Sequence, residues 1–134
     1  MKNVSTFNAK DVAITVNNIF LTGVAEDSFV TASKDEDEFT TSVGAQGDVS
    51  VSEVNNPLGT ITVTLQQSSP YVEYLNRLAV SKTMVPIWVF YNGRPKEKIG
   101  GTQARIKRPA AVNYSDDATD SNRSFEFQVF DYTQ

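Results

Sequence analysis

Hydrophobic and polar residues alternate with a period of two over most of the chain. Alternation of this kind is typical of a β-strand with one buried and one solvated face. It predicts strands at residues 12–16, 48–52, 60–65 and 124–129. The pattern is clearest in the third of these, where threonines alternate with large apolar residues: Thr60, Ile61, Thr62, Val63, Thr64 and Leu65.

Turn-forming residues separate these strands. The Asn-Asn-Pro-Leu-Gly stretch at 55–59 is expected to close a hairpin between strands near 48–54 and 59–65. Asn92-Gly93 predicts a second hairpin with a two-residue turn, because both residues tolerate a positive φ. This pair follows the unbroken apolar run 87–91, which we expect to be a strand covered on both faces.

The remaining signals complete the expected fold. Gly100-Gly101 is expected to separate a strand at 96–99 from another at 102–107. Apolar residues at helical spacing predict a single helix near 70–80, with Ser69 as its N-cap and Pro70 as its first residue. The chain is therefore expected to be mainly β: an antiparallel β sandwich or barrel with one flanking α-helix, forming a single domain over 1–134.

Two missing residue types restrict the chemistry more than the overall composition does. The 134-residue chain contains no histidine and no cysteine, which excludes Ser-His-Asp and Cys-His catalysis, cysteine redox chemistry and ordinary zinc sites. Its net charge of -4 argues against a free-standing DNA-binding protein. No stretch approaches the roughly 18 apolar residues of a membrane helix. We expect no cofactor, no metal and no membrane-spanning segment.

The candidate chemical sites all have simpler interpretations. The acidic run that begins at Asp35 lacks the glycine of a calcium loop, since its sixth position is Thr40. Gly44-Ala45-Gln46-Gly47 lies between strands and predicts a turn. Paired carboxylates would suffice for a glycosidase, but the sequence locates no such pair. The aromatic side chains of Trp88 and its neighbours Phe90 and Tyr91 could stack on sugars or bases, although a core position is the better interpretation.

Charge is distributed unevenly along the chain. Residues 1–66 carry a net charge of -6, residues 77–108 carry +7, and residues 109–134 carry -4. Opposite patches on one molecule favour head-to-tail contacts between copies. Alternatively, folding brings these segments together and neutralises them within one chain.

The order of these motifs resembles a known family. After the 12–16 strand come LTGVAED at 21–27, KDEDEFT at 34–40, VGAQGDVS at 43–50, NNPLGTITVTL at 55–65 and QQSSP at 66–70. Together they resemble the tail tube proteins of contractile-tailed bacteriophages, which are related to the tubes of R-type bacteriocins and of type VI secretion. The likeness runs from about residue 10 to the C-terminus and is strongest over 35–79. It includes no catalytic signature.

The resemblance implies a structural role without catalysis. Six copies are expected to form a ring by joining their sheets into one inner barrel, and the rings to stack into a tube through which DNA enters the host. The implied partners are other copies of the chain and the tail sheath, baseplate and tail terminator proteins; DNA passes through the lumen without specific binding. The protein is then expected in the phage tail of the virion, assembled in the bacterial cytoplasm.

Two sets of residues are candidates for this assembly. The 33–48 segment is expected to reach a neighbouring subunit or ring, and the basic 94–108 segment to receive it. The candidate contacts between subunits are Asp35, Glu36, Asp37, Glu38, Arg94, Lys96, Lys98, Arg105, Lys107 and Arg108. The candidate lumen-facing residues, expected on a single hairpin, are Ser50, Ser52, Thr60, Thr62 and Thr64. The alternative function is a small β-barrel module that binds carbohydrate or single-stranded nucleic acid near Trp88.

Overall fold

The computed structural model describes residues 11–22, 30–93, 96–112 and 122–134. Nine strands and one helix occur in these ranges, and every strand pairing is antiparallel. The elements are β1 (Val12–Val16), β2 (Ile19–Phe20), β3 (Val30–Lys34), β4 (Phe39–Val43), β5 (Val49–Glu53), β6 (Gly59–Leu65), α1 (Tyr71–Ser81), β7 (Val85–Tyr91), β8 (Glu97–Ile106) and β9 (Arg123–Val129).

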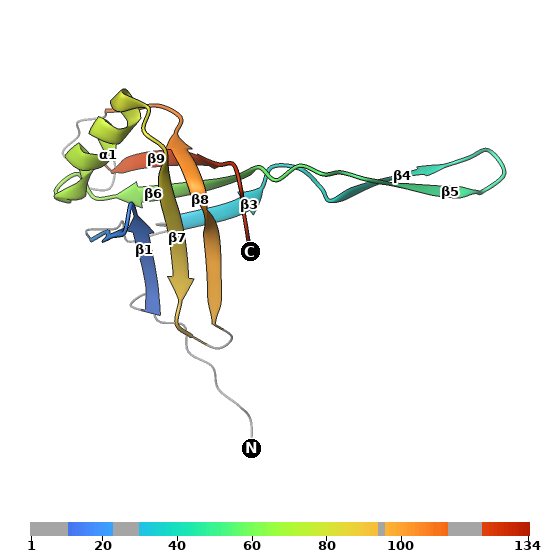
Figure 1. Ribbon diagram of the computed structural model, residues 1–134, viewed down its shortest axis with the longest axis horizontal. Coiled ribbons are helices and arrows are strands. Elements are labelled where there is room, and N and C mark those ends of the chain that lie inside the picture. The colour runs from blue at the N-terminus through green and yellow to red at the C-terminus, as the bar shows by residue number, and fades with distance from the viewer. Residues whose placement is uncertain (1–10, 23–29, 94–95, 113–121) are drawn as a thin grey trace, which may run out of the picture.

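Seven strands form one sheet that bends over a single core. Their order is β2-β1-β7-β8-β9-β6-β3. Figure 1 shows β1, β7 and β8 running across the direction of β9, β6 and β3, with α1 at one end of the body. The long strand β8 connects the two halves, because it pairs with β7 along most of its length and with β9 at its end. The expected mainly antiparallel β fold with one flanking helix is therefore confirmed.

The core is built from the alternation that predicts the strands. Ile61, Val63 and Leu65 of β6 are fully buried, and they face the same side as Phe125 and Phe127 of β9. Leucines 75 and 78 of α1 close one end of this core. The polar residues between the buried positions of β6 are partly exposed, as a strand with one solvated face requires.

Helix α1 starts one residue later than predicted. Pro70 is its N-cap, and the backbone N–H of Tyr71 donates a long hydrogen bond of 3.4 Å to Ser69 Oγ. The Ser69 hydroxyl donates a shorter one of 2.6 Å to the Thr22 carbonyl, which ties the start of the helix to the strand region near β2. The helix ends at Ser81, and the C-cap residue Lys82 adopts a left-handed conformation.

The predicted hairpin between 48–54 and 59–65 is wrong. Strand β5 pairs with β4, while β6 pairs with β3 and β9. Residues 55–58 are a connection between two sheets, not a turn within one. The turn at 44–47 is confirmed, because it joins β4 to β5 through a 2.7 Å hydrogen bond from the Gly44 N–H to the Asp48 carbonyl.

The β7–β8 region differs from the prediction in two respects. The hairpin at Asn92-Gly93 is present, but its loop is longer than two residues because Tyr91 pairs with Glu97. Gly100 does not separate two strands; it lies within β8 at φ +146, where an added Cβ would collide with the Ile87 carbonyl oxygen. A glycine at this position therefore lets β8 continue past the close contact with β7.

Strand β7 is not covered on both faces. Its burial alternates, so that Ile87 and Val89 enter the core while Trp88, Phe90 and Tyr91 are only partly buried. The core position expected for these three aromatic residues is therefore wrong. The apolar run forms a strand with one face in the core and one face that is partly exposed.

Candidate self-assembly surface

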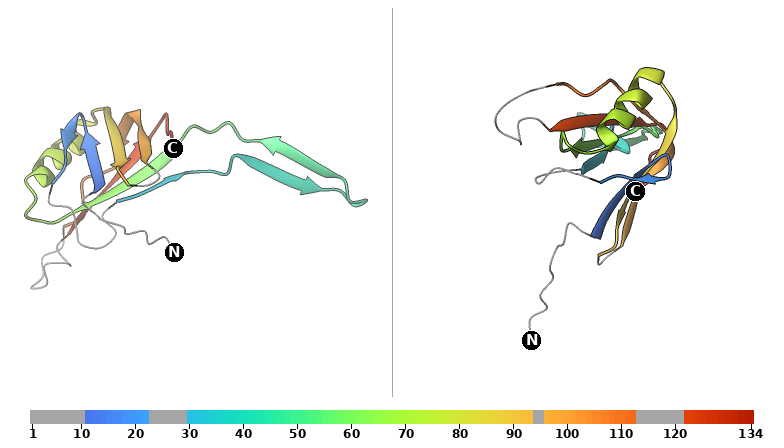
Figure 2. Two further views of the ribbon diagram at one scale, coloured as in Figure 1. Left: turned by 90° about the horizontal axis from the view of Figure 1, so that it is seen from below. Right: turned by 90° about the vertical axis from the view of Figure 1, so that its left-hand side faces the viewer.

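Strands β4 and β5 form a hairpin that leaves the body of the protein. Among the described residues they pair only with each other, and together they make the second, two-stranded sheet. Figures 1 and 2 show this hairpin extending away from the folded sheet. All ten residues of its strands are exposed. We call residues 39–53 the arm.

The arm has two chemically different faces. Thr40 and Ser42 pair in register with Ser52 and Ser50, so that one face consists of small hydroxyl side chains. The other face, here called the apolar arm face, consists of Phe39, Thr41, Val43, Val49, Val51 and Glu53. Its four large apolar side chains are 55–70% exposed. The expectation that Val49 and Val51 would be buried in the monomer is therefore wrong.

An uncovered apolar face of this kind is unusual for a strand pair. Isolated two-stranded hairpins are marginally stable in water and normally need packing on one face. Among the described residues, neither face of the arm is covered by another element. The arm is therefore a candidate for burial against another molecule.

Both ends of the arm are fastened to the body. The carboxylate of Asp35 accepts hydrogen bonds from Thr60 Oγ1 at 2.6 Å and from Gln128 Nε2 at 2.9 Å. These two bonds lower the pKa of Asp35, with a smaller contribution from the charge of Lys107, while burial opposes the shift. On the other side, the N–H of Tyr132 donates to the Pro57 carbonyl at 3.0 Å. These bonds set the direction in which the arm leaves the body.

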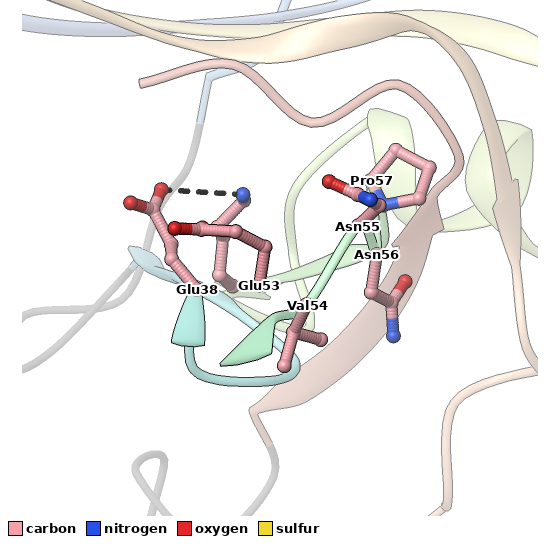
Figure 3. A pocket seen from close by; sticks show the side chains of 7 residues that line it. Glu38, Glu53, Val54, Asn55, Asn56 and Pro57 are labelled. Atoms are coloured by element: carbon pink, nitrogen blue, oxygen red, sulfur yellow. Dashed lines mark hydrogen bonds and ion pairs between the residues drawn. The ribbon is translucent and has the colours of Figure 1, made fainter. Parts of the chain in front are cut away.

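A shallow pocket lies at the base of the arm. Figure 3 shows Glu38, which precedes β4, and Glu53, the last residue of β5, on one side of it and Asn55 to Pro57 on the other. The ammonium of Lys34 lies 3.4 Å from Glu38 Oε1. In the part of the chain that the structure describes, acidic side chains do not gather in groups of three or more that could hold a metal ion.

The acidic residues 35–38 therefore divide into two groups. Asp35 is bonded to the body and supports the base of the arm. Glu36, Asp37 and Glu38 are exposed just before the arm, and of these three only Glu38 has an ion-pair partner among the described residues. These three remain candidates for contact between subunits.

The candidate basic residues are partly neutralised inside the chain. Glu126 lies 3.2 Å from the Lys107 ammonium and 3.7 Å from an Arg108 guanidinium nitrogen. Lys96 is exposed, Arg105 is partly buried opposite Gln128, and Arg94 lies outside the described residues. Folding thus brings part of the basic segment against the acidic C-terminal segment, which was one of the two alternatives for the uneven charge.

Lys98 has a different partner. Its ammonium lies 4.2 Å from the centre of the Trp88 ring and 5.7 Å from that of Phe90, on the outer face of β7. Cation–π attraction holds the charge over the indole. Lys98 therefore covers one face of the indole on which a sugar or a base could stack.

The candidate lumen residues lie on two separate sheets, not on one hairpin. Ser50 and Ser52 are on the polar face of the arm. Thr60, Thr62 and Thr64 are on the outer face of β6, opposite Gln128, Glu126 and Ser124 of β9. This outer face is also small and polar, and the Thr64 and Ser124 hydroxyls are hydrogen-bonded at 3.0 Å.

The apolar arm face was not among the candidate sites predicted from the sequence. Its signal is present as the alternation of Val49 and Val51, but the sequence pattern alone indicates burial within the chain. Apolar side chains are also exposed on the body, at Phe20, Val80, Met84 and Val112. In the described ranges, no helix is long and apolar enough to cross a membrane.

Comparison with known proteins identifies the family. The chain is similar in fold to the anti-feeding prophage cap, described as the AFP tube terminating cap, with a TM-score of 0.61 over 99% of this chain and 93% of that one. The two sequences are only 9% identical, so this likeness concerns the fold alone. Among curated proteins, none matches the chain. The family model of the bacteriophage PhiTE tail tube protein matches residues 5–87, more than half of the sequence and including the arm and α1, and the chain therefore belongs to this tail tube family.

Proposed function

We propose that this tail tube protein is the repeating structural subunit of a contractile phage tail, and that it assembles into stacked hexameric rings whose lumen conducts DNA into the host. The supporting observation is the arm, whose apolar face is uncovered in the single chain. Burying that face between copies removes apolar surface from water, which favours assembly.

The body supports the same proposal through its sheet edges. Strands β2 and β3 are the two ends of the seven-stranded sheet, and each has one side without a partner strand among the described residues. Exposed edges invite pairing with another strand, and closing the sheets of six copies into a ring satisfies them. In this proposal residues 1–134 act as one domain and perform no catalysis.

The charge of the chain suits a conduit for DNA. Six copies of a chain with net charge -4 carry about -24 charges per ring. A lumen lined by hydroxyl side chains with this negative background would repel phosphates and leave DNA unbound. We propose that the lumen lining includes Ser50 and Ser52 from the arm and Thr60, Thr62 and Thr64 from the body.

The remaining partners follow from the same role. The outside of the tube would contact sheath subunits, and its ends would contact baseplate and terminator proteins, in a virion assembled in the bacterial cytoplasm. We propose that contacts between subunits include the acidic residues at the base of the arm, Glu36, Asp37 and Glu38. They also include basic residues of the 94–108 segment, among them Lys96 and Arg105.

Self-assembly of the purified chain tests the proposal. Sedimentation velocity over a range of concentrations, followed by negative-stain electron microscopy, is expected to show rings or tubes with an open centre. A chain that stays monomeric at the highest concentrations, and whose tryptophan fluorescence shifts on addition of an oligosaccharide or a single-stranded oligonucleotide, would contradict the proposal. That result would favour the binding module instead.

A further inference from the structure

The apolar arm face requires a partner with a matching surface. Phe39, Val43, Val49 and Val51 are 55%, 70%, 64% and 59% exposed, and they lie together on one side of a two-stranded ribbon. Asp48 at the tip and Glu53 near the base give the arm two negative charges and no positive one. The matching surface should therefore be apolar with positive charges beside it.

Such a surface exists at the end of α1. Val80 is 71% exposed and Met84 is 51% exposed, at the last turn of the helix and in the loop that follows. Arg77, one helical turn before Val80, and Lys82, between Val80 and Met84 in the sequence, are also exposed. We call Arg77, Val80, Lys82 and Met84 the helix-end patch. The segment 77–84 carries these two positive charges and no negative one.

The charges on both surfaces have no ion-pair partner in the part of the chain that the structure describes. Among the described residues, Asp48, Glu53, Arg77 and Lys82 form no ion pair. By contrast, Lys107 and Arg108 are already paired with Glu126. The helix-end patch therefore presents two positive charges, and the arm two negative charges, that form no ion pair among the described residues.

The two surfaces lie at opposite ends of the molecule. Both views in which the long axis is horizontal show α1 at one end of the body and the arm leaving from the other (Figures 1 and 2). The arm therefore points away from the helix-end patch of its own chain. A contact between an arm and a patch at opposite ends is heterologous, and it propagates from copy to copy as a ring or a filament requires.

We propose that the apolar arm face of one copy docks on the helix-end patch of a second copy, with Asp48 and Glu53 of the arm beside Arg77 and Lys82 of the patch. This inference rests on the proposed function, because it names the partner surface for the arm in self-assembly. Each copy gives one arm and receives one, so every contact in the assembly is equivalent.

Charge reversal tests the contact. One double variant changes the arm, Asp48→Lys with Glu53→Lys, and another changes the patch, Arg77→Glu with Lys82→Glu. Each alone places like charges together and is expected to raise the concentration needed for assembly about tenfold or more. The chain carrying all four changes restores opposite charges and should assemble within about threefold of wild type. Circular dichroism and thermal unfolding of each monomer confirm that the fold is intact.

Engineered disulfides give a second readout, because the chain has no native cysteine. With Val51→Cys and Val80→Cys in one chain, mild oxidation of the assembled protein should produce a ladder of covalent oligomers on a denaturing gel. The matched control combines Ser42→Cys, on the polar face of the arm, with the same Val80→Cys, and should give no ladder.

The outcomes separate the two proposals. If wild type assembles but the charge variants assemble equally well and the Val51/Val80 pair gives no ladder, the docking inference is wrong and the tube proposal stands. If wild type does not assemble at all, both are overturned. If the fourfold charge variant assembles as wild type does and the Val51/Val80 cysteine pair gives covalent oligomers, both the tube proposal and the docking inference are supported.

Discussion

Replacing the valines of the arm should separate folding from assembly. We consider the triple variant Val43→Thr, Val49→Thr and Val51→Thr. Threonine has almost the same shape as valine and suits a strand equally well, so the arm itself should be retained. In the monomer these side chains are 59–70% exposed, and the free energy of unfolding should change by less than about 0.5 kcal/mol.

The cost in the assembly is much larger. Each substitution removes a methyl group whose burial is worth about 0.8 kcal/mol. It also buries a hydroxyl group, which costs about 1 kcal/mol without a partner. For three positions the penalty is about 5 kcal/mol per arm, which corresponds to an increase of about three to four orders of magnitude in the concentration at which assembly begins.

Sedimentation velocity across a concentration series measures this change, and urea unfolding of the monomer measures the stability. The matched control places the same number of substitutions on the other face of the arm, as Ser42→Thr, Ser50→Thr and Ser52→Thr. This variant keeps a hydroxyl at every position and should assemble as wild type does. If the valine variant assembles at the wild-type concentration, its apolar face is not buried between copies and the reasoning fails.

Two further predictions concern the body. Phe127→Ala removes a fully buried ring that pairs in register with Ile61, and should lower the free energy of unfolding by about 3–5 kcal/mol, measured by urea denaturation. Burial alone would raise the pKa of Asp131, but hydrogen bonds from Thr102 and Gln103 outweigh it and hold the pKa below the ordinary value of 3.8. Its contribution to stability is therefore present above pH 3.8 and lost as the pH falls through the lower folded-state value. Asp131→Asn should accordingly weaken the acid-induced loss of stability, measured by urea unfolding at about pH 7 and about pH 3; an unchanged acid dependence would contradict this.

Much of the body could be predicted from the sequence because its signals are local. The alternation in β6 and β9 matches the pleat of a strand with one buried face, and Phe125 and Phe127 are buried as that pattern requires. The helix was predicted to within one residue, because apolar spacing and a Ser-Pro start mark it.

Strand pairing could not be predicted in the same way, because it depends on residues far apart in the chain. The Asn-Pro connection at 55–58 has the composition of a turn, but β6 pairs with β9, which lies about half of the sequence away. Contacts such as Asp35 with Gln128, which are 93 residues apart, decide where β3 ends and the arm begins. The turn-forming residues near 55 carry no information about these long-range contacts.

The arm shows why the functional surface was the hardest part to predict. Val49 and Val51 of β5 alternate with serines just as Ile61 and Val63 of β6 alternate with threonines, and both patterns predict one buried face. In β6 that face is buried within the chain, whereas in β5 it is exposed. The sequence records which side chains are selected for burial but not which molecule covers them. Under the proposed assembly of copies, the alternation in β5 is a signal for burial against a second copy, as the alternation in β6 is a signal for burial within the chain.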